Sequence, residues 1–280
     1  MAENHRAEVA AGKRFRFGRN WARFLERVGD ERILQARLSL CRTLGVETLA
    51  GKAFIDIGCG SGLFSLAARQ LGAQVVSFDF DPESVACAKK LKQAFFGADL
   101  NVEDAWRISE GSVLDREFLA GFGEHDIVYS WGVLHHTGHL WQALDNLAPL
   151  VRPGGRLFIA LYNDQGWVSR YWTLVKRLYN HSRILALLAV IVHLPYPFLA
   201  SVALRALSGR LNAERGMSAW HDYIDWLGGY PFEVAKPEEV FTFFREHGFV
   251  LSYLKTCGGR QGCNEFVFQR PPLAGLDSAR

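Results

Sequence analysis

A glycine-rich turn and a later acidic residue are the first candidates for chemistry in this sequence. The segment Asp56-Ile57-Gly58-Cys59-Gly60-Ser61-Gly62 follows an apolar stretch, and Asp79 lies 21 residues beyond Gly58. Glycines at such a turn let the backbone approach a ligand closely, and free amides at a helix start attract a carboxylate or another anionic group. An acid at this distance is typical of α/β folds that bind ribose hydroxyls. The alternatives are a plain strand-to-helix connection and a helix cap, a role that Asp81 fills better.

The spacing of the glycines bears on which nucleotide is bound. Gly58, Gly60 and Gly62 lack the third glycine placement of the motif G-x-G-x-x-G, whose close helix approach serves a diphosphate. Asp56 precedes the turn, where its carboxylate can hold an ammonium group directly or through water. An amino-acid moiety with one carboxylate and one ammonium suits these groups. The pattern therefore favours a sulfonium cofactor, S-adenosyl-L-methionine, over NAD.

A second candidate group is Trp131-Gly132-Val133-Leu134-His135-His136, directly after another strand-like stretch. The carboxyl ends of parallel strands face the ligand crevice in an open α/β sheet. A histidine there titrates near neutrality and can act as a general base, with His135 preferred over His136. The alternative is that one of them starts the next helix and binds the backbone. Trp131 either forms a wall beside the sulfonium or the acceptor, or belongs to the core.

Other features restrict the chemistry. No Asn/Asp-Pro-Pro-aromatic motif follows that strand, which disfavours methylation of a base amino group and favours an oxygen or carbon acceptor. Cys257 and Cys263 lack the partner spacing of a zinc site, so no metal is expected. The loop 258–262 between them predicts a hairpin, whose neighbours Arg260, Asn264 or Glu265 contact substrate if the loop reaches the crevice. Five cysteines without repeated spacing, and no apolar leader, indicate a cytoplasmic protein.

Strand-like and helix-like stretches alternate around these residues. The pattern predicts strands at 53–57, 74–79, 106–109, 126–130 and 156–161, with helices at 62–71, 82–94, 115–121 and 139–150. This is the pattern of a parallel α/β sheet that is covered on both faces. Asp81 and Pro82 predict a capped helix start, and Arg152-Pro153-Gly154-Gly155 predicts a turn before the last of these strands.

The rest of the chain divides around this core. We expect a basic arm and a helix at 1–49, a core at 50–162, a mainly helical insertion over the substrate at 163–232, the rest of the core at 233–270, and a tail at 271–280. Residues 184–204 form a run without Lys, Arg, Asp or Glu that is long enough to span a bilayer. Pro195 and Pro197 interrupt this run. Two shorter helices that rest on a membrane surface, or a buried helical pair, fit better.

The N-terminal arm is the most basic part of a chain whose formal charge is only +3. A net charge this small gives little support for nucleic acid as a partner. The arm is expected to be solvated, with an anionic membrane or a phosphate-bearing substrate as alternatives. Its basic residues are Arg6, Lys13, Arg14, Arg16, Arg19 and Arg23, against Glu3 and Glu8.

The segments DIGCGSG, VVSFDFDPES, GSVLD, DIVYSWGVLHH and LAPLVRPGGRLFIALYN together resemble the class I S-adenosylmethionine-dependent methyltransferases. The resemblance covers roughly residues 50–163 and is closest to the branch of the ubiquinone and menaquinone pathway methyltransferases. It implies a Rossmann-like, seven-stranded α/β sheet, with the final antiparallel pair at 250–254 and 264–269.

The resemblance also implies roles for individual residues. Asp56 and the turn Gly58, Cys59, Gly60 and Gly62 would surround the methionine part of the cofactor. Asp79 would bind the ribose, Phe80 would lie beside the adenine, and Ser112 and Val113 would lie near the adenine edge. Many relatives have an acid where Ser112 stands, so adenine recognition through backbone groups is expected here.

These features predict a methyltransferase that acts on a small molecule by O- or C-methylation, with a quinone or lipid-like acceptor as one possibility. No obligate protein partner is inferred, and peripheral membrane association through 184–207 remains open. The alternatives are a nucleic-acid or protein methyltransferase, and a protein that binds the cofactor without catalysis.

Overall fold

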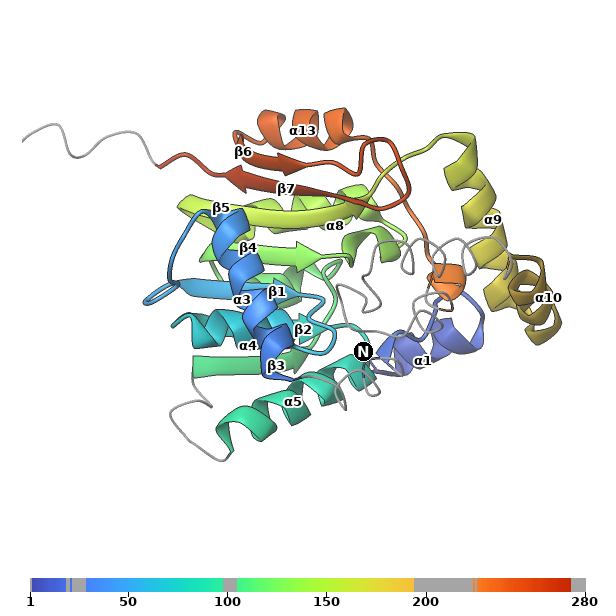
Figure 1. The fold of residues 1–280 in the computed structure, drawn as a ribbon, viewed down its shortest axis with the longest axis horizontal. Coiled ribbons are helices and arrows are strands. Elements are labelled where there is room, and N and C mark those ends of the chain that lie inside the picture. Colours follow the sequence, from blue (N-terminus) through green and yellow to red (C-terminus); the bar gives the residue numbers. More distant parts are fainter. Residues whose placement is uncertain are drawn as a thin grey trace, which may run out of the picture.

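The computed structural model describes residues 2–18, 21, 29–97, 105–193, 224 and 226–272, and these residues contain a seven-stranded sheet. The strand order is β3-β2-β1-β4-β5-β7-β6 (Figure 1). The parallel strands are β1 (Ala53–Ile57), β2 (Gln74–Asp79), β3 (Trp106–Glu110), β4 (His125–Trp131) and β5 (Val151–Tyr162). β7 (Cys263–Gln269) runs antiparallel to both β5 and β6 (Val250–Lys255). The predicted Rossmann-like sheet with its final antiparallel pair is confirmed.

Helices cover both faces of this sheet. One face packs against α3 (Asp30–Leu44), α4 (Leu63–Gln70) and α5 (Pro82–Phe96). The other packs against α7 (Arg116–Ala120), α8 (Leu140–Leu147) and α13 (Pro237–Glu246). Neighbouring residues of a strand face opposite sides of the sheet. Phe54 packs in the core cluster beneath α3, α4 and α5, and Ile55 packs in the cluster beneath α7, α8 and α13. Burial on both sides explains why these strands are almost continuously apolar in sequence.

Local chemistry fixes the helix ends nearest the candidate residues. The Asp81 carboxylate accepts a hydrogen bond from the Glu83 amide at 2.9 Å, and Pro82 occupies the first turn of α5. This arrangement confirms the predicted cap. At the end of α3, Gly45 adopts φ 63°, a left-handed conformation that favours glycine and ends the helix there.

The prediction that residues 152–155 form a turn before the strand is wrong, because these residues lie within the strand. β5 already begins at Val151 and includes Arg152-Pro153-Gly154-Gly155. Val151 pairs with His125, but the next pair joins Arg156 to Ile127, so the extra residues of β5 form an irregularity within the β4–β5 ladder. Proline and glycine therefore mark a bulge inside a strand rather than its start.

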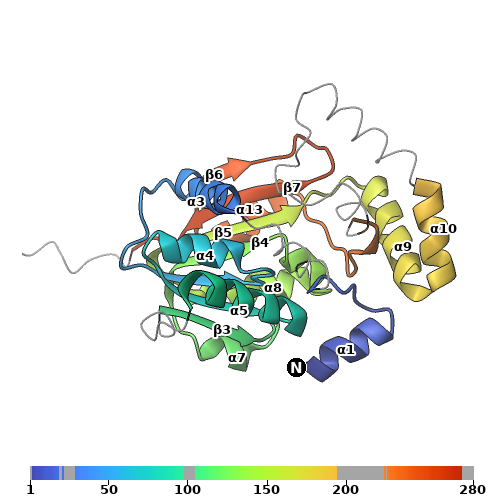
Figure 2. The same ribbon diagram turned by 60° about the horizontal axis from the view of Figure 1, so that its bottom comes forward.

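Three helices lie at the end of the molecule to which the arrows of β1 and β4 point (Figures 1 and 2). They are α1 (Ala2–Ala10), α9 (Trp167–His181) and α10 (Arg183–His193). α10 has 11 residues, and within the described ranges no helix has the length and apolarity needed to cross a bilayer. The interruption expected at Pro195 and Pro197 lies outside the described residues.

Candidate functional site

The glycine turn lies between two other segments that press against it. Gly58, Gly60 and Gly62 all have positive φ, and Cys59 between them is buried. A Cβ on Gly58 would lie 2.3 Å from Val133 in the loop after β4, and one on Gly60 would lie 3.0 Å from the indole of Trp21. Any larger residue at these two positions would therefore collide, which gives the glycines a packing reason as well as a conformational one.

Asp56 is held at the end of β1 by a chain of side-chain hydrogen bonds. The Ser65 hydroxyl donates to Asp56 Oδ2 at 2.5 Å, the Ser65 and Ser77 hydroxyl oxygens lie 2.8 Å apart, and Trp106 Nε1 donates to Ser77 at 2.7 Å. Since Ser65 already donates to Asp56, Ser77 donates to Ser65. Burial is the main cause that raises the pKa of Asp56 to about 7, against the Ser65 hydrogen bond, which lowers it.

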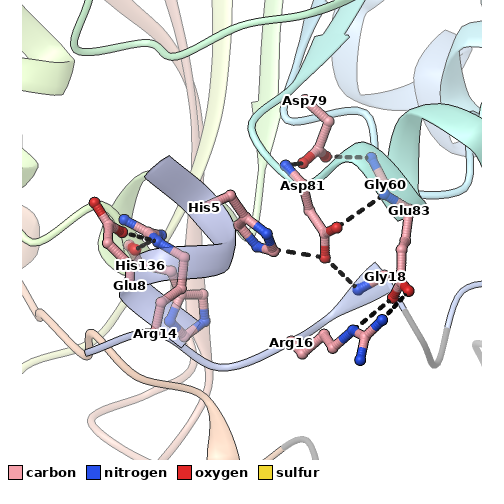
Figure 3. Close-up of polar contacts among 10 residues, drawn as sticks. All are labelled: His5, Glu8, Arg14, Arg16, Gly18, Gly60, Asp79, Asp81, Glu83 and His136. Carbon is pink, nitrogen blue, oxygen red and sulfur yellow. Dashed lines mark hydrogen bonds and ion pairs between the residues drawn. The ribbon is translucent and has the colours of Figure 1, made fainter. Parts of the chain in front are cut away.

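Asp79 lies at the end of β2, beside the glycine turn. Its Oδ2 accepts from the Gly60 amide and its Oδ1 from the Asp81 amide, both at 2.9 Å (Figure 3). Burial raises the pKa of Asp79 to about 6, although these two amides lower it. Each carboxylate oxygen retains acceptor capacity beyond one amide, so ribose hydroxyls can still bind there.

The residues expected around the adenine lie next to Asp79. The Gly111 amide donates to the Asp79 carbonyl oxygen at 3.0 Å, which brings the start of the segment containing Ser112 and Val113 to the end of β2. Val113 is buried in the core, and the Ser112 hydroxyl accepts from the Leu114 amide at 3.2 Å. Trp131, at the end of β4, packs at the edge of the core cluster beneath α3, α4 and α5.

The N-terminal arm (residues 2–18) crosses this region rather than extending into solvent. The imidazole of His5 meets the ring of Phe80 edge-on at 5.5 Å, and the Arg14 guanidinium lies 4.8 Å from the centroid of the same ring. The Gly18 amide donates to Asp81 Oδ2 at 2.7 Å (Figure 3). The expectation of a solvated arm is therefore only partly right. Arg6, Lys13 and Arg16 are exposed, whereas His5 and Gly18 are buried against the segment that follows β2.

Ion pairs within the protein use two of the basic residues of the arm. Arg14 Nε donates to Glu8 at 2.6 Å and Arg16 Nε donates to Glu83 at 2.9 Å (Figure 3). Arg14 Nη1 also donates to the backbone carbonyl of His136 at 2.8 Å. The sequence analysis missed these contacts. The available signal was the alternation of basic and aromatic residues at 14–17, where Phe17 packs 4.9 Å from the His136 ring.

The two histidines of the 3-10 helix η1 (Leu134–His136) have different hydrogen-bond partners. His135 is fully buried, its Nδ1 accepts from the Tyr162 amide at 3.3 Å, and its Nε2 has no hydrogen-bond partner among the described residues. His136 Nδ1 lies 2.6 Å from the Pro231 carbonyl oxygen, which can only accept. These partners assign the proton of His135 to Nε2 and that of His136 to Nδ1.

Burial and nearby positive charge keep both imidazoles neutral. Burial lowers the pKa of His135 well below its usual range, and His136 and Lys176 lower it further. Burial also lowers the pKa of His136 to about 3, although the Pro231 hydrogen bond opposes this. Lys176 is a buried residue of α9 whose ammonium lies 4.0 Å from the centroid of Trp226. A neutral His136 has its lone pair on Nε2, where it can accept a proton.

The hairpin loop between β6 and β7 is predicted correctly, but its polar residues serve the fold. Asn264 is buried and donates to the Asn163 side chain at 2.9 Å. Its oxygen accepts from the Cys257 amide at 3.0 Å, and the Arg260 carbonyl accepts from Asn163 at 3.4 Å. In the part of the chain that the structure describes, no group of three or more His, Cys, Asp or Glu could hold a metal ion.

Together these groups suit a ligand with an ammonium group and a ribose. The carboxylates of the buried Asp56 and the half-buried Asp79 both have raised pKa values, so an added cation and hydroxyl donors would stabilise their charged forms. They lie at the ends of adjacent strands, because β1 pairs directly with β2. His136 lies on the loop after β4, the other neighbour of β1. The chemistry that this arrangement permits is binding of a nucleoside with a charged amino-acid group, next to a proton acceptor.

Comparisons with known proteins agree with this geometry. A family model described as a methyltransferase domain matches residues 55–157. A ubiquinone biosynthesis O-methyltransferase from Xanthomonas oryzae pv. oryzae is 33% identical over 115 residues, which are 41% of this chain and 45% of that protein. The chain thus spans about half the length of the curated relatives that it matches.

Solved structures with a similar fold include proteins with different reactions. Magnesium protoporphyrin IX methyltransferase from Synechocystis PCC 6803, with bound SAH, superposes with a TM-score of 0.51 at 15% identity, over 85% of this chain and 83% of that one. The [4+2]-cyclase SpnF superposes with a TM-score of 0.52 at 12% identity, over 86% of this chain and 81% of that one. At these sequence identities the structural similarity shows the fold only, and the reaction has to be inferred from the residues of the site.

Proposed function

We propose that this chain is an S-adenosylmethionine-dependent methyltransferase that acts on a small molecule, and the match of residues 55–157 to a family model described as a methyltransferase domain supports this. The observation that carries the proposal is the pair of carboxylates beside the glycine turn, the buried Asp56 and the half-buried Asp79. In this proposal Asp56 holds the ammonium group of the cofactor and Asp79 holds the ribose. Phe80, Ser112 and Val113 flank the adenine, and Trp131 lies beside the turn.

S-adenosylmethionine supplies an electrophilic methyl group on a sulfonium when bound. The residues of the chain would orient the acceptor and remove its proton. His136 is the better candidate for the base, since its Nδ1 donates to Pro231 and its Nε2 lone pair is available. With a pKa of about 3 it is a weak base, and it would take up a proton only where negative charge developing on the acceptor raises that pKa. The accepting atom of His135 is occupied by the Tyr162 amide, so His135 would instead donate a hydrogen bond from Nε2.

The charges around His136 bear on the class of acceptor. Lys176 and Arg14 lower the pKa of His136, and the same positive charges would stabilise an acceptor oxygen that has lost its proton. We therefore favour an acceptor with an acidic hydroxyl or an enolisable carbon, consistent with O- or C-methylation. A quinone-like acceptor would fit, and the relatives named ubiquinone biosynthesis O-methyltransferases support it.

The contacts of the arm reduce the case for a nucleic-acid substrate. The basic arm was the only sequence feature in favour of that alternative, and Arg14 and Arg16 form ion pairs with Glu8 and Glu83. A cytoplasmic location remains our inference, supported by cysteines that are all free thiols among the described residues.

Calorimetry with S-adenosylmethionine and its demethylated product tests cofactor binding directly. Asp79→Ala should weaken binding of both by roughly 10- to 100-fold, the range expected for losing hydrogen bonds to a charged group. Asp145→Ala, at an exposed ion pair with Arg116, is the matched control and should leave affinity unchanged. Absence of binding of both compounds at millimolar concentration would refute the proposed function.

Turnover of methyl-labelled cofactor in cell extracts, followed by mass spectrometry of metabolites and lipids, identifies the acceptor. His136→Ala should lower turnover by about 10²- to 10⁴-fold with little change in cofactor affinity, because removing a base affects the chemical step. His135→Ala should retain more activity. Equal turnover in wild type and His136→Ala would remove His136 from the mechanism, and cofactor binding without turnover would favour a non-catalytic protein.

A further inference from the structure

Trp21 packs on the glycine turn, although it lies far from the turn in sequence. A Cβ built on Gly60 would be 3.0 Å from Cε2 of the indole, 3.1 Å from Nε1 and 3.2 Å from Cζ2. Cε2 is bonded to the other two atoms, and it would be the farthest of the three if Gly60 met the edge of the ring in its plane. Gly60 therefore meets a face of the indole, which fills the space that the absent side chain of the glycine leaves open.

The chain just before Trp21 is held by contacts on both sides of the candidate site. The Gly18 amide donates to Asp81 Oδ2 at 2.7 Å (Figure 3), and the Phe17 ring lies 4.9 Å from the ring of His136. A Cβ on Gly18 would lie only 2.5 Å from the Cβ of Glu83, so the backbone touches the start of α5 there. Trp21 follows Gly18 by three residues, and these contacts keep the indole close to the turn.

The position of the indole can be related to the parts of the proposed cofactor. The Gly60 amide donates to Asp79 Oδ2 at 2.9 Å, and Asp79 holds the ribose in the proposed function. Asp56, at the end of the neighbouring strand, holds the ammonium group of the methionine part. In S-adenosylmethionine the sulfur joins the ribose to the methionine chain. Trp21 is half-buried against the residue between these two groups, so its indole lies on the side of the turn where the sulfur belongs.

The two carboxylates contact parts that the cofactor shares with its demethylated product. The two compounds have the same ammonium group and the same ribose, and they differ at the sulfur. The sulfur is a cationic sulfonium before transfer and a neutral thioether afterwards, because the electron pair of the broken carbon–sulfur bond stays on sulfur while the methyl carbon bonds to the acceptor. An indole face attracts a cation that lies within about 6 Å of the ring. Trp21 therefore has the chemistry to recognise the one charge that the reaction changes.

We propose that Trp21 is a cofactor-binding residue that selects the methyl-bearing form through contact of its indole with the sulfonium. This inference deepens the proposed function and rests on it. Trp21 lies outside residues 55–157, so the match to the family model assigns it no role. The attraction ends when the sulfur becomes neutral, so the protein binds the product more weakly than the cofactor at this contact and exchanges it more readily.

Calorimetry on the full-length protein with S-adenosylmethionine and with its demethylated product tests the proposal. Trp21→Leu should weaken binding of S-adenosylmethionine by about five- to thirty-fold, the loss expected for a cation–π contact that is partly shielded from water. Binding of the product should weaken by no more than about threefold, because only apolar contact is lost. Trp21→Phe keeps an aromatic face and should retain most of the preference for the charged form.

The matched control is Trp141→Leu, which removes a tryptophan that is 40% exposed on α8 and should change neither affinity. Unchanged circular dichroism would establish that the variants fold. Equal weakening of both compounds in Trp21→Leu, or no weakening, would overturn the proposal. Tighter binding of both would also overturn it, since the indole would then occupy the cofactor site in the unliganded protein.

The same titrations keep this inference separate from the proposed function. A wild-type protein that binds neither compound refutes the proposed function itself. A wild-type protein that binds both, with a ratio of affinities that Trp21→Leu preserves, refutes the role of Trp21 alone. The ratio is the decisive quantity, because a general loosening of the N-terminal segment would weaken binding of both compounds alike.

Discussion

At the scale of single residues, the candidate site depends on two carboxylates, of which Asp56 is buried and Asp79 is half-buried. Desolvation is the main cause of the raised pKa values of Asp56 and Asp79, and the negative charge of Asp79 raises the pKa of Asp56 further. The hydrogen bonds from Ser65 and from the amides of Gly60 and Asp81 act in the other direction. A positively charged or hydroxyl-bearing ligand would therefore stabilise the ionised forms of both acids.

Cofactor affinity should therefore rise with pH. Ionised Asp56 is the form that pairs with an ammonium group, and its pKa in the folded protein is about 7. Below that pH, affinity for the demethylated cofactor should fall by up to about tenfold per pH unit, and above pH 8 it should level off. Calorimetry between about pH 5.5 and 8.5 measures this slope. Asp56→Asn should bind weakly with a flatter profile, and an equal slope in that variant would contradict the assignment.

The same shift acts on stability with the opposite sign. Since the pKa of Asp56 rises from 3.8 to about 7 on folding, the folded state holds its proton more tightly. This contribution is present below pH 4 and is lost as pH rises toward 7, so Asp56→Asn should reduce the loss of unliganded stability across that window.

At the scale of elements, the N-terminal arm connects the two sides of the site. His5 and Arg14 contact Phe80 after β2, and Arg14 and Phe17 contact His136 after β4. One short segment therefore touches both the expected adenine side and the proposed base. Its position depends on a few side-chain contacts and on the amide of Gly18, rather than on membership of the sheet.

Replacing Arg14 should affect the cofactor and the reaction together. Arg14→Gln removes the ion pair with Glu8, the bond to the His136 carbonyl and the charge over Phe80. We expect cofactor affinity to fall by about tenfold, the equivalent of one charge-assisted hydrogen bond, and turnover to fall as well. Arg6→Gln, an exposed position on α1, is the control. Equal cofactor affinity and equal turnover in the two variants would show that Arg14 contributes to neither binding nor catalysis.

At the scale of the whole molecule, two core clusters pack on the two faces of the sheet and fix the positions of the strand ends. The cluster beneath α7, α8 and α13 includes Phe244, which packs against Phe249 and Phe268. This contact attaches α13 to the antiparallel pair at the edge of the sheet. β1 and β2, which carry Asp56 and Asp79, and β4, which precedes the loop of His136, are packed between this cluster and the one beneath α3, α4 and α5.

Truncating Phe244 should therefore destabilise the whole fold. Phe244→Ala at this fully buried position is expected to lower the free energy of unfolding by about 3–5 kcal/mol, measured by denaturant titration. Phe241→Ala, on the same helix but 37% exposed, should cost less than about 1 kcal/mol. Similar losses in the two variants would show that α13 contributes little to the core.

The sequence by itself predicted the parallel part of the sheet and the position of Asp56 and Asp79 at one edge of it. Alternation of apolar strands and helices predicted β1 and β2 at their observed ends, and parallel neighbours bring Asp56 and Asp79 to one edge. These features follow from local periodicity and short-range turn chemistry, which a sequence carries explicitly. The roles of Phe80, Ser112 and Trp131 remain proposals that rest on the resemblance.

Only the tertiary structure decided what lies over that edge. The proton positions of His135 and His136 depend on Tyr162 and Pro231, of which the second is 95 residues away in sequence. The arm reaches Phe80 and His136 through single side chains, and the turn expected at 152–155 became a bulge because β5 pairs with β4 from Val151 onward. No local pattern encodes such contacts, because each depends on where two distant segments meet after the core has packed.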